Sequence, residues 1–182
     1  MFRRAVSLAL LLPTAAAAAM PALLSEDGPL EVASFLALAL ACLMSLRRLR
    51  GRALPAHIHV PTILFVLAER EAEPGLAFVS TALLDPAFWR AAALTPATAA
   101  GAALLVAVLL SLVTLPAFGV PAFRRAFRAG RRWPRMLLLA GAAAALSIGA
   151  EEMGHGVLWL AVEEGAELLF ALLVLASTAS RR

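Results

Sequence analysis

The feature that most constrains the fold is a series of apolar stretches, each close to the length of a membrane-spanning helix. Six of them divide the 182-residue chain, at 5–24, 30–46, 57–75, 98–118, 136–149 and 157–177. A helix needs about 20 apolar residues to cross a hydrocarbon core of about 30 Å. Hydrophobic residues make up 62% of the chain and charged residues 15%, against about 45–50% and about 25% in soluble domains. We therefore exclude an ordinary soluble enzyme and predict an all-α polytopic transmembrane helix bundle of six spans, with residues 1–182 forming a single integral membrane domain.

The first apolar stretch has two interpretations. Arg3 and Arg4 precede a run rich in alanine and leucine, which is typical of a secretory signal peptide. Residues 21–24 extend the same run to spanning length, which favours a retained helix. Residues 1–24 are therefore either the first of six spans or a cleaved signal that leaves five.

The arginines predict the orientation of the chain in the membrane. All basic residues are arginine, and all except Arg70 and Arg90 lie on one side of the membrane in a six-span arrangement. Segments rich in Lys and Arg stay in the cytoplasm. We predict a multi-pass protein of the cytoplasmic (inner) membrane with both termini in the cytoplasm.

Carboxylates lie inside the last predicted span, where charge is costly. Glu163 and Glu164 precede Glu167 by four and three residues, so both lie on the same helix face as Glu167. An acidic residue at a helix centre costs about 2.5–3.5 kcal/mol on insertion. We expect these side chains to face the bundle interior and to be neutralised by protons, a cation or a basic partner.

A second charged group ends the third predicted span. It consists of Glu69, Arg70, Glu71 and Glu73. Arginine stays charged and binds a carboxylate through two parallel hydrogen bonds. We predict that Arg70 pairs with one of the three glutamates of the last span. Because one arginine neutralises only one carboxylate, the combined cluster is a candidate site for protons or a cation.

The evidence for a metal in the sequence is slight. Glu152 and His155 have the Glu-x-x-His spacing of di-iron carboxylate bundles. Such sites use two copies of this motif, and here glycines flank His155. A divalent metal is therefore a secondary alternative, and the sequence identifies no cofactor. His57 and His59 are interpreted as residues of the membrane interface.

The stretch 118–135 combines arginines with aromatic side chains. Phe123 and Phe127 are four residues apart, which predicts a short amphipathic helix. Because this stretch lies between two spans, we expect it to lie on anionic lipid headgroups rather than to bind nucleic acid. Its arginines are Arg124, Arg125, Arg128, Arg131, Arg132 and Arg135.

Small residues recur every four positions in the fifth predicted span. Gly141, Ala145 and Gly149 form a face that allows another helix to approach closely. We predict packing within the bundle, with homodimerisation as the alternative.

The order of the charged motifs resembles a group of uncharacterised multi-spanning bacterial membrane proteins. The motifs are Glu26-Asp27-Gly28 with Glu31, Arg70-Glu71 with Glu73, and Glu163-Glu164 with Glu167. The resemblance implies the architecture and no established activity.

We therefore expect a non-enzymatic membrane protein whose carboxylate–arginine cluster binds protons or a cation. A structural or assembly subunit is one alternative. A membrane enzyme that uses carboxylates and His155 is the other.

Overall fold

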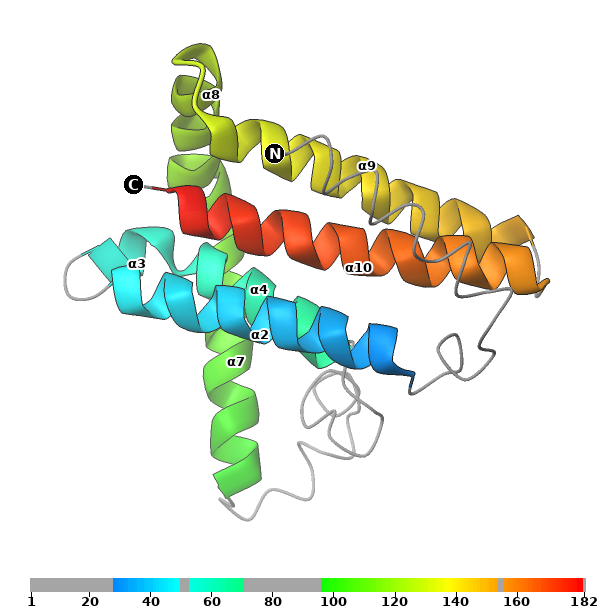
Figure 1. The fold of residues 1–182 in the computed structure, drawn as a ribbon. Helices are drawn as coiled ribbons and strands as arrows, with labels where there is room; N and C mark the ends of the chain where they lie inside the picture. Colours follow the sequence, from blue (N-terminus) through cyan, green and yellow to red (C-terminus); the bar gives the residue numbers. More distant parts are fainter. Residues whose placement is uncertain (1–27, 50–52, 71–95, 154–155, 182) are drawn as a thin grey trace. The chain divides into compact units, whose positions relative to one another are not determined.

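The computed structural model of the chain describes residues 28–49, 53–70, 96–153 and 156–181 (Figure 1). Within these ranges every regular element is helical, which confirms the predicted all-α class for this part of the chain. The elements are α2 (Pro29–Arg48), α3 (Ala53–His57), α4 (His59–Arg70), α7 (Pro96–Thr114), the π-helical turn η2 (Leu115–Gly119), α8 (Val120–Arg128), α9 (Arg132–Met153) and α10 (Val157–Ser180).

Three segments of the described chain are long and apolar enough to cross a membrane. They are Pro29–Arg48, Gly101–Arg128 and Arg132–Met153, and they cover the predicted second, fourth and fifth spans. The predicted third span is represented by α4, which has only 12 residues, and the predicted first span lies outside the described residues. α10 has 24 residues but carries three glutamates. Membrane-capable helices are thus present, whereas the number of six spans stays a prediction.

Local sequence explains where the helices begin and end. Pro29 opens α2, where its fixed φ suits the first turn and its missing N–H costs nothing. Glu31 in the first turn and Arg47 and Arg48 in the last complement the helix dipole. α8 ends at a turn in which Gly130 has a φ of 68°, a left-handed conformation that favours glycine.

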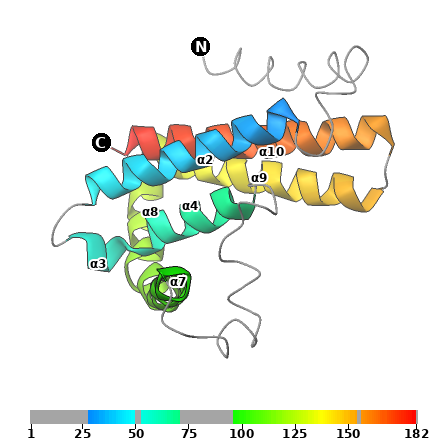
Figure 2. The same ribbon diagram turned by 90° about the horizontal axis from the view of Figure 1, so that it is seen from below.

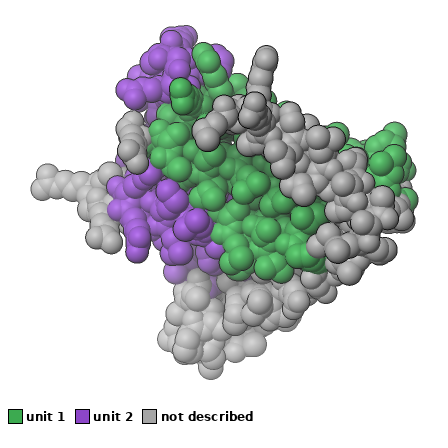
Figure 3. Space-filling view, in the orientation of Figure 1, with its two compact units in different colours: residues 1–37, 132–182 green, residues 38–131 purple. Residues whose placement is uncertain are grey.

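The chain divides into two compact units, coloured separately in Figure 3. The hairpin unit comprises residues 1–37 and 132–182, and the α7 unit comprises residues 38–131. Each unit is described separately below.

In the hairpin unit, α9 and α10 run antiparallel and lie side by side in both views (Figures 1 and 2). The buried side chains of α9 are small along the contact: Ala140, Ala143, Ser147 and Ala150. Their spacing of three and four residues follows one stripe of the helix. Ala161, Ala166 and Ala171 are buried on α10. The two backbones therefore approach closely through a seam of small residues.

This seam is not the small-residue face that the sequence analysis selected. Gly141, Ala145 and Gly149 are all exposed, and a Cβ added at either glycine would meet no heavy atom within 4 Å. Among the described residues of the hairpin unit this face therefore makes no helix contact, and its packing within the bundle stays a prediction. The seam lies on the opposite side of α9, because at about 100° per residue the two stripes are centred about 180° apart.

Polar and aromatic contacts join α9 and α10 at the end of the hairpin that is opposite the connection between the two helices. The guanidinium of Arg181 lies over the ring of Trp133, 4.3 Å from its centroid. Ser177 Oγ donates a hydrogen bond to the carbonyl oxygen of Trp133 at 3.1 Å. These contacts join the end of α10 to the first turn of α9.

In the α7 unit, α4 packs against α7, and α3 contacts η2 and α7. Cys42 Sγ of α2 donates to the carbonyl oxygen of Pro61 in α4 at 3.4 Å. α7, η2 and α8 form one continuous helical segment, because Thr114, Gly119 and Val120 all keep right-handed helical φ and ψ angles. The short helix predicted in 118–135 is present as α8, but it extends α7 rather than forming a separate element (Figure 1).

Candidate functional site

The first candidate site is the set of carboxylates on α10. Glu163, Glu164 and Glu167 are half-buried on the hairpin unit. Glu167 lies ten residues after the start of α10 at Val157, which is about 15 Å along a helix of about 36 Å. A half-buried carboxylate therefore occupies the middle of a helix as long as a membrane span.

The α9–α10 seam supplies a partner for this carboxylate. Ser147 Oγ donates a hydrogen bond to Glu167 Oε1 at 3.1 Å. Ser147 is only 5% exposed and belongs to the buried stripe of α9. Because a hydroxyl can both donate and accept, Ser147 suits Glu167 in the ionised and in the protonated state. The Glu167 carboxylate therefore lies against a polar side chain at the contact between α9 and α10.

The charged residues at the end of α4 are only partly described. Glu69 is 8% exposed in the α7 unit. Glu71, Glu73 and the side chain of Arg70 lie outside the described residues. The predicted ion pair between Arg70 and a glutamate of α10 therefore stays a prediction.

Only one of the two residues of the predicted metal motif lies among the described residues. Glu152 is exposed in the last turn of α9, and His155 lies outside the described residues. Within the ranges that the structure covers, no three His, Cys, Asp or Glu side chains are grouped to hold a metal ion. A divalent metal at Glu152 and His155 stays a prediction.

Sequence reasoning missed a second polar cluster, which lies inside the α7 unit. His59 is 4% exposed, and its Nδ1 is 3.1 Å from Thr114 Oγ1 across the contact between α4 and α7. Its ring lies edge-on to His57, with centroids 5.8 Å apart, and His57 contacts Phe118 in the same way at 6.3 Å. The histidines interpreted as interface residues are therefore part of a packed aromatic and polar cluster.

The π-helical turn η2 contributes backbone to this cluster, because its last residue, Gly119, lies against the His59 ring. π-helical turns are rare in proteins, and those that occur are frequently found at functional sites. Thr114 immediately precedes the turn, and Gly119 ends it. A Cβ added at Gly119 would lie 2.8 Å from His59 Nε2, so the ring occupies the space that a side chain would need. The signals available in the sequence were Gly119 itself and two prolines, Pro116 and Pro121, in what looked like one continuous helix.

The predicted lipid-facing arginines fall at the end of α8 and the start of α9. All six are exposed: Arg124, Arg125 and Arg128 in α8, Arg131 in the turn, and Arg132 and Arg135 in α9. The aromatic rings of Phe123 and Phe127 stack on α8, with centroids 6.1 Å apart and an interplanar angle of 13°. α8 thus carries an aromatic stripe beside a cationic one.

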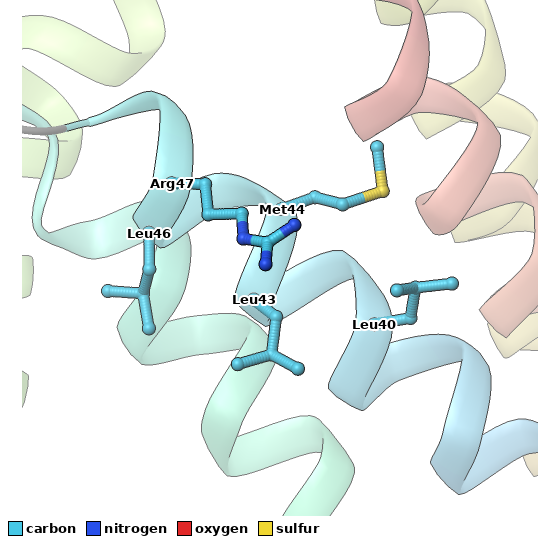
Figure 4. Close-up of a pocket in the computed structure, with 5 residues that line it drawn as sticks. All are labelled: Leu40, Leu43, Met44, Leu46 and Arg47. Atoms are coloured by element: carbon cyan, nitrogen blue, oxygen red, sulfur yellow. The ribbon is translucent and has the colours of Figure 1, made fainter.

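A surface hollow of about 430 Å³ lies beside the C-terminal half of α2. Its described lining is Leu40, Leu43, Met44, Leu46 and Arg47. Figure 4 shows these side chains fanning out from one helix without converging on a common point. The hollow therefore presents apolar surface with one guanidinium and no set of convergent polar groups.

Comparison with protein-family models, curated proteins and solved structures gives no match to this chain.

Proposed function

We propose that the protein is a multi-pass inner-membrane protein whose α9–α10 hairpin binds protons or a small cation at carboxylates within the hydrocarbon layer. The observation that carries the proposal is the hydrogen bond from Ser147 to Glu167 across the hairpin. α9 is long and apolar enough to cross a membrane. Because α10 packs antiparallel along α9, Glu167 lies within the layer that α9 crosses.

The energetics favour a titrating or cation-binding role over a fixed charge. An acidic residue at mid-membrane costs about 2.5–3.5 kcal/mol. Glu163 and Glu164 add two more half-buried carboxylates within about one turn of Glu167. Uptake of a proton or a cation neutralises such a group, and an intramembrane acid with a polar partner is typical of proton and ion sites.

The topology proposed with this function has six spans and both termini in the cytoplasm. It is supported by the three membrane-capable segments and by the distribution of the arginines. α8, the turn that follows it and the first turn of α9 together carry six arginines and then lie on the cytoplasmic side.

Infrared spectroscopy of the full-length protein in lipid nanodiscs tests the proposal. We expect a carboxyl stretching band that changes with pH or on addition of Na⁺ or Mg²⁺. Glu167→Gln should remove this change, and Ser147→Ala should shift its midpoint. Glu151→Gln is the matched control, because Glu151 is exposed near the end of the same hairpin, and it should leave the change intact.

Transport by reconstituted protein gives a second measurement. Vesicles that contain wild-type protein and a pH-sensitive dye should equilibrate protons faster than vesicles with Glu167→Gln. If Glu167→Gln alters neither the spectrum nor the flux, the carboxylates serve packing, and the assembly-subunit alternative replaces this proposal.

A further inference from the structure

α8 lies at the end of a helical segment that is longer than a bilayer core is thick. α7, η2 and α8 together form one helical segment of 33 residues, Pro96–Arg128, which is about 50 Å of helix. A hydrocarbon core of about 30 Å accommodates about 20 of them. The other residues project beyond the core, and we place α8 among them because its arginines are costly within the core. Its arginines therefore reach the depth of the lipid headgroups.

The side chains of α8 are arranged for contact with such a surface. Arg124 and Arg128 are four residues apart on one face, and Arg125 lies about 100° further round. All three are exposed. The stacked pair Phe123 and Phe127 lies beside them, and Phe127 is 45% exposed.

The charge near α8 in the sequence has one sign. No acidic residue occurs between Asp85 and Glu151, so the arginines of α8 have no carboxylate close to them along the chain. Guanidinium groups bind phosphate oxygens through paired hydrogen bonds. Phenylalanine is typical of the apolar face of helices at the boundary between headgroups and acyl chains.

We propose that α8 is a binding site for anionic phospholipids, in which Arg124, Arg125 and Arg128 bind headgroup phosphates and Phe127 packs at the acyl boundary. Lipid phosphates are the first polyanions that a helix emerging from the bilayer meets, which favours them over nucleic acid. Each basic residue near an anionic leaflet strengthens binding by about fivefold. The site differs from a helix that lies flat on the surface, because α8 continues a membrane-capable helix.

The π-helical turn η2 sets which way the arginine face of α8 points. A π turn holds one residue more than an α turn, so it rotates the following helix by about 100° relative to an uninterrupted α-helix. The turn is held against α4 by the contact of His59 with Thr114 and its close approach to Gly119. The arginine face of α8 is therefore oriented by the core of the α7 unit.

The test uses the full-length protein in vesicles and measures the association of spin-labelled phosphatidylglycerol relative to phosphatidylcholine. Wild type should prefer the anionic lipid severalfold, and 1 M salt should reduce the preference because it shortens the screening length to about 3 Å. The variant R124Q/R125Q/R128Q should bring the ratio towards one. R124K/R125K/R128K keeps the charge and should retain most of the preference. R47Q/R48Q, at the end of α2, is the matched control and should change the ratio less.

Several results would overturn the proposal. One is a wild-type protein without lipid preference, and another is an R124Q/R125Q/R128Q protein that keeps the wild-type ratio. A lysine variant that behaves like the glutamine variant would exclude charge as the cause. An effect of R47Q/R48Q as large as that of the α8 variant would indicate general anchoring instead. Binding of a labelled oligonucleotide that is lost in the α8 variant, with lipid preference unchanged, would make nucleic acid the ligand.

Discussion

Replacing Gly119 by alanine is the most direct test of the histidine cluster. The added Cβ would lie 2.8 Å from both His59 Nε2 and Leu115 Cδ1, whereas relaxed carbon contacts are about 3.5–4.0 Å. Leu115 is 40% exposed, so the end of its side chain can rotate away. His59 is buried and bonded to Thr114, so its ring can move only by breaking that bond or by shifting α4.

The expected cost follows from these contacts. Overpacking a filled site costs about 1–3 kcal/mol, and losing the His59–Thr114 hydrogen bond adds about 0.5–1.5 kcal/mol. Alanine regains about 0.5–1 kcal/mol in a helix relative to glycine. We expect Gly119→Ala to lower the free energy of unfolding by about 0.5–4 kcal/mol, with a central value of about 2 kcal/mol.

Denaturant unfolding of the purified protein in detergent, followed by circular dichroism, measures this change. Gly141→Ala is the matched control, since Gly141 is a helical glycine with open space around it, and it should be neutral or stabilising. In a His59→Ala background the added methyl group has room, so the penalty of Gly119→Ala should disappear. The reasoning is wrong if Gly119→Ala is as stable as Gly141→Ala, or if its cost is the same with and without His59.

Two further predictions concern the ends of the hairpin and its orientation. A double-mutant cycle of Trp133→Ala and Arg181→Ala should give a coupling free energy of about 0.5–1 kcal/mol from the cation–π contact, and strictly additive effects on unfolding would exclude that contact. Reporter fusions should place Arg128 in the cytoplasm and Glu152 outside, because the arginines between the predicted fourth and fifth spans are retained inside; an external signal at Arg128 would refute the orientation.

The long helices could be predicted from the sequence because their signal is local. The predicted span 30–46 lies within α2, and 157–177 lies within α10. Helix length and apolar composition are read within one window, without knowledge of any partner helix. The fourth predicted span ends at Phe118, because the arginines that follow it are typical of a segment between two spans. The structure instead continues the helix to Arg128.

The helix contacts could not be predicted in the same way. Between Ala140 and Ala150 every residue except Leu146 and Ile148 is small, so several faces of α9 look equally suited to packing. The four-residue repeat of Gly141, Ala145 and Gly149 indicates a face other than the one that packs against α10. The contact between His59 and Thr114 joins positions 55 residues apart, and nothing near either residue indicates the other. In contrast, Glu167 can be singled out as a candidate from the sequence alone, because a carboxylate in the middle of an apolar stretch is costly wherever its partner lies.

The pairing of Ser147 with Glu167 has a consequence for biogenesis. α9 alone is apolar enough to leave a translocon for lipid, whereas α10 carries three glutamates in its first eleven residues and partitions poorly by itself. Only residues 154–156 separate the two helices. α10 is therefore expected to enter the bilayer together with α9, with the carboxylate of Glu167 already sheltered by the hydroxyl of its neighbour. The small residues of the seam would then govern how efficiently the nascent chain is inserted, before they contribute to the stability of the mature protein.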